Sequence, residues 1–129
     1  MTKRAAALMI VFALTAAPGA ADAQENLRPD PPYEADIVRL SEILGALHYL
    51  RDLCGADEGQ LWREKMADLL TAEAPAEARR AKLIDSFNRG YRGFRNAYTH
   101  CTDSAVFVIE RYMKEGTDIS ARIASRYGN

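Results

Sequence analysis

The residues in this sequence best suited to chemistry are two cysteines, Cys54 and Cys101, and two histidines, His48 and His100. Thiolate and imidazole groups are preferred ligands of Zn²⁺, so a Cys2His2 site can be drawn. Zinc sites of this kind bring their ligands in close pairs such as C-x2-C or H-x3-H, and neither spacing occurs here. On a helix, the adjacent His100 and Cys101 would point in different directions. We therefore expect no metal site and no cofactor, and we interpret the histidines as surface or half-buried residues.

The two cysteines are better explained by a disulfide, provided that the chain leaves the cytoplasm. An exported domain with an even number of cysteines is typically disulfide-bonded, and two cysteines allow one connectivity. In the chain-entropy model, closing the 48-residue loop from Cys54 to Cys101 stabilises the fold by roughly 4 kcal/mol. A pair of reactive or metal-binding thiols remains the alternative.

No other group of residues indicates catalysis. None of the serines Ser41, Ser86, Ser104, Ser120 and Ser125 lies in a Gly-x-Ser-x-Gly turn. Neighbouring carboxylates such as Asp57 and Glu58 fall on predicted solvated faces, and a small helical bundle offers little room for a cleft. We therefore predict no catalytic residue, and we favour a protein that is not an enzyme.

Residues 79–95 form the segment most suggestive of binding. They carry six basic residues and one acidic residue, a local charge of +5, and two aromatic residues lie among the last three arginines. Arginine and aromatic side chains are enriched at interface hot spots. The candidate partner-binding residues are Arg89, Tyr91, Arg92, Phe94 and Arg95.

An intramolecular role for the same arginines is the favoured interpretation. Residues 52–77 carry seven acidic and two basic residues, a local charge of −5. Because this segment and the arginine-rich one form neighbouring and presumed antiparallel helices, their charges can pair with each other. Exposed pairs are each worth up to about 1 kcal/mol, but they determine which faces meet.

Apolar spacing predicts the elements that must position these residues. From Tyr33, apolar residues recur at helical spacing until Gly55, which suits the left-handed position after a helix. Asp57 is expected to cap a second helix, which Pro75 ends. A third helix begins at residue 76, and its apolar series stays in phase to residue 114.

We expect this long series to break, because residues 99–104 are weak helix formers and Thr102 can cap a new helix. Gly116 is expected to end that helix, and Thr117 to cap a short last one. No alternating apolar pattern indicates a strand. The predicted fold is all-α, a small bundle of four or five helices with one disulfide.

The first 23 residues have the three-part pattern of a cleavable signal peptide. Lys3 and Arg4 precede a 13-residue apolar run, residues 5–17, and small residues occupy positions 21 and 23. The run falls short of the roughly 20 residues that span a membrane. We predict a signal peptide at 1–23, a proline-rich extended leader at 24–32 and a bundle domain at 33–129. The protein would then be periplasmic and not an integral membrane protein.

The predicted mature chain, residues 24–129, has the length of one domain and nearly balanced charge. Without Lys3, Arg4 and Asp22 it keeps 15 basic and 17 acidic residues. A nucleic-acid-binding protein usually shows a clear basic excess, so we expect no nucleic-acid partner.

Several short segments together resemble a family of small exported alphaproteobacterial proteins, a domain of unknown function with two well-separated cysteines. They are residues 51–55, 87–91, 101–102, 111–116 and 126–128, which read RDLCG, FNRGY, CT, RYMKEG and RYG. The resemblance covers residues 36–128. It implies an alphaproteobacterial periplasm and supports pairing of Cys54 with Cys101, and it implies no activity, substrate or cofactor.

The leading hypothesis is a non-enzymatic periplasmic protein that binds another cell-envelope component, in an adaptor or structural role. The partner is expected to be an envelope protein or a cell-wall component. One alternative is an enzyme or enzyme activator that acts on cell-wall material. The other is a thiol-redox or metal-binding periplasmic protein.

Overall fold

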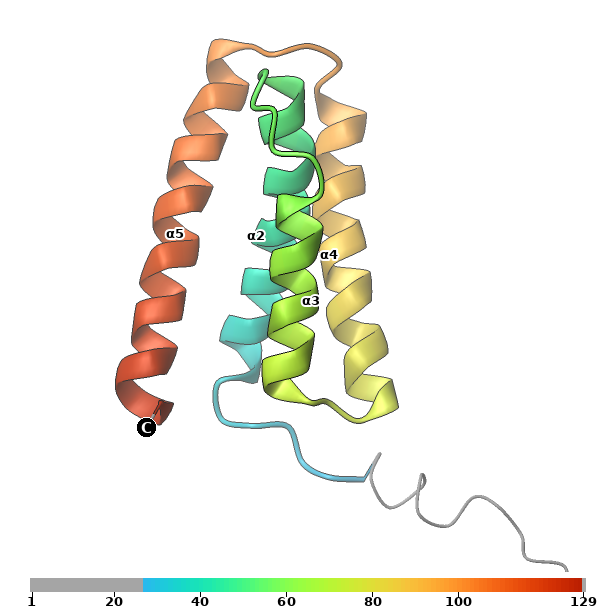
Figure 1. Ribbon diagram of the computed structural model, residues 1–129, viewed down its shortest axis with the longest axis vertical. Coiled ribbons are helices and arrows are strands. Elements are labelled where there is room, and N and C mark those ends of the chain that lie inside the picture. The colour runs from blue at the N-terminus through green and yellow to red at the C-terminus, as the bar shows by residue number, and fades with distance from the viewer. Residues whose placement is uncertain (1–26, 129) are drawn as a thin grey trace, which may run out of the picture.

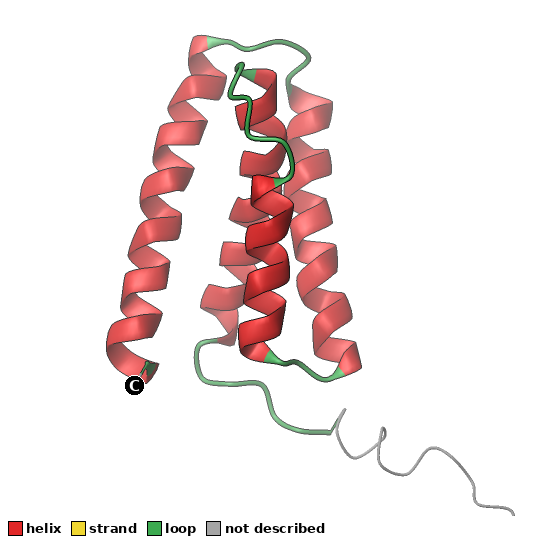
Figure 2. Cartoon of the chain, viewed as in Figure 1, coloured by secondary structure: helices red, strands yellow, loops and turns green. Residues whose placement is uncertain are grey.

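A computed structural model describes residues 27–128, and the predicted signal peptide lies outside the described residues. The chain forms four helices, α2 (Glu34–Leu53), α3 (Leu61–Glu73), α4 (Glu77–Ala97) and α5 (Asp103–Tyr127) (Figure 1). Each helix runs antiparallel to the one before it, and loops join them at alternate ends (Figure 2). The described residues contain no strand, so the all-α prediction is confirmed, with four helices.

Helix α2 is the centre of the bundle, because it packs against each of the other three helices. In Figure 1, α3 lies across α2, with α4 on one side and α5 on the other. A helix that is apolar on several faces must be buried on several faces. The buried residues of α2 are Ile37, Ser41, Ile43, Leu44, Gly45, Ala46, Leu47 and Leu50.

Two glycines let the backbones of α2 and α4 come into direct contact. A Cβ added at Gly45 would lie 1.8 Å from the carbonyl oxygen of Phe87, and one added at Gly90 would lie 2.0 Å from that of Glu42. Real atoms do not approach so closely, so no side chain larger than hydrogen fits at either crossing position. Gly93, one turn further along α4, is exposed and has nothing within 4 Å of its virtual Cβ.

The predicted break in the long apolar series is confirmed. Helix α4 ends at Ala97, and α5 begins at Asp103 after Thr102, whose Oγ1 accepts a hydrogen bond from the Ala105 amide at 3.1 Å. The side-chain cap satisfies one amide that the first turn of a helix cannot pair internally. Gly55 has φ +87°, as expected for the residue that follows the end of α2.

Two boundary predictions are wrong. Helix α5 continues through Gly116 to Tyr127, because Gly116 packs against Leu40 and Ile43 of α2 and this tertiary contact outweighs the low helix propensity of glycine. Asp57 does not cap α3, which begins at Leu61 after Gln60. The loop in between is held by Glu58, which accepts hydrogen bonds from the Arg51 guanidinium.

Helix α5 is attached to the bundle by one apolar face and by ion pairs. Only three of its 25 residues are buried, namely Ala105, Ile109 and Ile119. Arg39 of α2 donates two hydrogen bonds to the Glu115 carboxylate, at 2.7 and 3.0 Å. Arg122 donates two to Asp36, at 3.1 and 2.7 Å. The bidentate geometry makes these pairs stronger than ordinary surface bridges. None of the described helices is long and apolar enough to cross a bilayer.

We predict that Gly90→Ala lowers the free energy of unfolding by at least about 2 kcal/mol, because the new methyl group must push α2 and α4 apart. Urea denaturation of the variant and the wild type measures this. Gly93→Ala is the matched control on the same helix, and it should stabilise the protein by up to about 1 kcal/mol through helix propensity. Equal effects at the two positions would contradict the proposed backbone contact.

We also predict that acid loosens α5 before the rest of the bundle. Hydrogen bonds from Arg39 lower the pKa of Glu115, and those from Arg122 lower the pKa of Asp36. A carboxyl whose folded pKa lies below its unfolded value, about 4 for Asp and Glu, stabilises the fold at neutral pH. That stabilisation is lost as the pH falls through the depressed folded pKa.

Glu115→Gln tests this attachment at neutral pH. Amide hydrogen exchange should accelerate several-fold in α5, with little change in α4, because a partly buried pair of this kind is worth about 1 kcal/mol. Glu110→Gln, an exposed position on the same helix, is the control. Unchanged exchange in the Glu115→Gln protein would show that α5 is held by its apolar contacts alone.

Candidate functional site

Five of the six basic residues of α4 fall into two groups, and the first group, Arg79 and Lys82, is neutralised inside the molecule; the sixth residue, Arg80, is exposed near the start of the helix. Arg79, only 13% exposed, bridges Glu34 of α2 and Glu73 of α3, both at 2.7 Å. Lys82 pairs with Asp30 at 2.8 Å and with Glu34 at 2.6 Å. These cations attach the segment before α2 and the end of α3 to the start of α4. Their role is structural.

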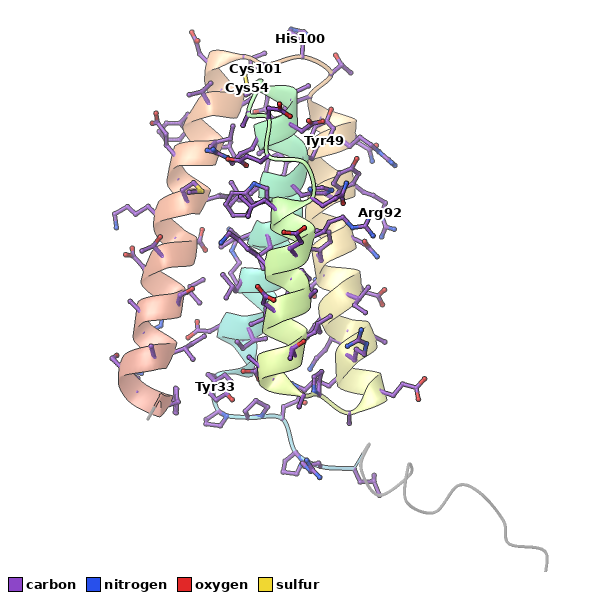
Figure 3. The ribbon with its side chains drawn as sticks, in the orientation of Figure 1. Tyr33, Tyr49, Cys54, Arg92, His100 and Cys101 are labelled. Atoms are coloured by element: carbon purple, nitrogen blue, oxygen red, sulfur yellow. A yellow bond between two sulfur atoms is a disulfide. The ribbon has the colours of Figure 1, made fainter. Side chains whose placement is uncertain are left out.

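The second group consists of the predicted binding arginines Arg89, Arg92 and Arg95. All three are exposed, and none forms an ion pair with any residue of the described part of the chain. Arg89 donates a 3.2 Å hydrogen bond to Ser86 Oγ on its own helix. Arg92 extends from α4 away from the other helices (Figure 3). The helix thus carries a cationic face that the described fold leaves available.

Within the described residues, the acidic segment pairs with α4 at one position, Glu73, which binds Arg79 near the turn that connects the two helices. Glu58 is bound by Arg51 instead, which lowers the pKa of the Glu58 carboxyl. Asp57, Glu64 and Asp68 are exposed and form no ion pair with described residues. The expected charge pairing between these helices therefore accounts for Arg79 and not for Arg89, Arg92 or Arg95.

The two aromatic candidates, Tyr91 and Phe94, are half-buried and pack toward the bundle. The Tyr91 ring lies 5.5 Å from that of His48 and 5.5 Å from that of Tyr49, measured between centroids. The Phe94 ring meets Tyr112 of α5 edge-on at 5.5 Å. The Arg95 guanidinium lies over the Tyr91 ring at 5.8 Å, in cation–π geometry. Tyr91 therefore supports Arg95 from the bundle side, whereas Phe94 packs against α5.

A groove between α3 and α4 adjoins this face. It has a volume of about 420 Å³ and an apolar floor of Met66, Leu70 and Phe87, which are all buried. The other residues that line it are His48 of α2, Arg63 and Ala67 of α3, and Ile84, Asn88 and Tyr91 of α4. This groove was not predicted from the sequence, because a spacing pattern shows that α3 and α4 have apolar faces but not that a groove lies between these faces.

His48 is the titratable group of this groove. Burial lowers the pKa of the imidazole, Arg63 lowers it further, and Asp52 acts in the opposite direction. The lowered pKa favours the neutral form of the ring. Its Nδ1 atom is buried and has no hydrogen-bond partner among the described residues. A buried polar atom without a partner is uncommon in proteins and indicates unmet hydrogen-bonding capacity at this position.

The pairing of Cys54 with Cys101 that the sequence predicts is confirmed. The Sγ atoms of Cys54 and Cys101 lie 2.09 Å apart, at disulfide bonding distance (Figure 3). The bond joins the end of α2 to the loop before α5, and the Tyr49 hydroxyl donates a hydrogen bond to the Tyr98 carbonyl of the same loop. Within residues 27–128, no cluster of three or more His, Cys, Asp or Glu side chains could hold a metal ion. His100 is exposed on this loop.

Comparison with known proteins finds one family. The family described as "Protein of unknown function (DUF2385)" matches residues 32–127, which include all four helices and both cysteines. No curated protein matches the chain, and no solved structure does.

We predict that Cys54→Ala/Cys101→Ala lowers the free energy of unfolding by roughly 4 kcal/mol, because the unfolded chain regains the entropy of a 48-residue loop. Urea denaturation measures the loss. Adding dithiothreitol should cause the same loss of stability in the wild type and should leave the stability of the double variant unchanged. A loss below about 1 kcal/mol would mean that the bond contributes little to the fold.

Proposed function

The chain belongs to the DUF2385 family, and we propose that it is a non-enzymatic binding protein of the bacterial periplasm. Its docking surface is the arginine face of α4, which we define as Arg89, Arg92 and Arg95. Its partner is another envelope protein that presents an acidic surface. The observation that carries this proposal is that α4 uses Arg79 and Lys82 in internal bridges and leaves these three arginines, which lie together toward its end, without a carboxylate partner among the described residues.

The arginine face has the geometry to bind carboxylates. Residues at i, i+3 and i+6 climb about 9 Å along the helix, so the three guanidinium groups cover two turns. Each guanidinium can hold a carboxylate through two parallel hydrogen bonds, which is why arginine is preferred over lysine at such interfaces. Packing against Tyr91 restrains Arg95 before a partner arrives, and this reduces the entropy lost on binding.

The periplasmic location is supported by two features of the chain. Residues 1–23 have the pattern of a secretory signal, and a disulfide of this kind persists in an oxidising compartment. The resemblance to exported alphaproteobacterial proteins points to the same compartment.

The cell-wall enzyme alternative gains no support from the site. A hydrolytic site would need two carboxylates, or a histidine and a carboxylate, in one cleft. The groove that contains His48 has no Asp or Glu among its described lining residues. The carboxylates Asp36 and Glu115, which line a second hollow between α2 and α5, are each bound by an arginine.

We predict that Arg89→Glu/Arg92→Glu abolishes docking of the partner without unfolding the bundle, because both side chains are exposed and form no ion pair with a described residue. Chemical crosslinking in living cells, followed by mass spectrometry of the captured proteins, measures docking. At least one protein captured by the wild type should be lost or depleted at least ten-fold.

Arg80→Glu/Arg111→Glu is the matched control for this experiment. It makes the same change in net charge at two exposed arginines outside the arginine face, one on α4 and one on α5. It should capture the wild-type set of proteins. If Arg89→Glu/Arg92→Glu also captures that set, the arginine face is not the docking surface.

A further inference from the structure

We propose that the groove between α3 and α4 is a binding site for a single acyl chain that ends in a carboxylate. The chain lies on Met66, Leu70 and Phe87, and the carboxylate lies at the end of the groove formed by Arg63 and His48. The acyl-chain site is separate from the arginine face, which serves a protein partner.

The groove is apolar at one end and cationic at the other. Because α3 and α4 are antiparallel, Arg63 near the start of α3 shares an end with Tyr91 and Arg95 near the end of α4 (Figure 1). Leu70 and Ile84 lie toward the opposite end, and Met66 and Phe87 lie in between. A ligand that matches this order has a charged head and an apolar chain.

The cationic end favours an anion and not a neutral or positive head group. Arg63 is exposed and forms no ion pair with a described residue, and no acidic residue lines the groove. His48 lines the groove at the same end, and its Nδ1 has no hydrogen-bond partner among the described residues, so this end also holds unused hydrogen-bonding capacity. A carboxylate would pair with the Arg63 guanidinium there.

The length of the groove favours one chain over a docked helix. Its lining runs from Arg63 to Leu70 on α3 and from Ile84 to Tyr91 on α4, eight residues on each, which corresponds to about 10 Å of helix. A docked protein surface usually covers about 800 Å² on each side, which is much more than two helical turns provide. A volume of about 420 Å³ lies within the range of small-molecule sites.

Titration of the full oxidised chain with decanoate, below its micelle concentration, tests the proposal. Calorimetry should show one saturable site, and amide chemical shifts should change mainly at the residues that line the groove. Decanol has the same chain without the charge, and decyltrimethylammonium carries the opposite charge. Both should bind at least ten-fold more weakly than decanoate. Equal affinity for decanoate and decanol would overturn the proposal, as would shift changes centred outside the groove.

Two variants with matched controls test the groove itself. Ala67 is exposed on the α3 wall, so Ala67→Phe fills the groove and should weaken decanoate binding more than ten-fold. Ala72→Phe makes the same change on the solvent side of α3 and should bind as the wild type does. Arg63→Gln should weaken binding about five-fold, and Arg80→Gln should not change it.

Because there are two variants, one of them can still refute the proposal if the other misfolds. Wild-type affinity in a folded Ala67→Phe or Arg63→Gln protein would overturn it. The result is independent of the docking proposal, because the titration measures the groove and the crosslinking experiment measures the arginine face.

Discussion

The direct contact between the backbones of α2 and α4 is the constraint on which the other features depend. Gly45 and Gly90 allow the two helices to approach until a methyl group at either position would overlap a carbonyl oxygen of the other helix. Protein interiors are packed so closely that such a contact leaves no space for additional atoms. Since α2 is central, the contact also determines which face of α4 is buried and which faces solvent. The arginine face is exposed as a consequence.

The charges of the bundle are arranged by the same geometry. Near its start, α4 meets the end of α3 and the segment before α2, so Arg79 and Lys82 find carboxylates there. Toward its end, α4 meets no carboxylate of α3 among the described residues, and a groove with an apolar floor lies between the two helices. Arg63, Arg89, Arg92 and Arg95 surround that region and are left without acidic partners in the described chain. One helix therefore carries both the cations that stabilise the bundle and those of the proposed docking surface.

Much of the fold follows from local sequence signals. Apolar spacing predicts the helices, Thr102 predicts the start of α5, and Gly55 predicts the end of α2. These features depend on residues within one or two turns of each other. The two wrong boundaries have a different origin. Gly116 is kept helical by contact with α2. Asp57 does not cap α3, because it lies in a loop that the Arg51–Glu58 ion pair holds. Both outcomes depend on residues elsewhere in the chain.

The sequence by itself determined that the chain is helical and that Cys54 can pair only with Cys101, because helix formation is local and two cysteines allow one bond. It also identified the arginine-rich helix. Only the tertiary structure decided which of its cations are neutralised, and only it revealed the groove beside them. Ion pairs and grooves depend on which faces of distant helices meet. That choice is made by close packing across the bundle, which no spacing within a single helix records.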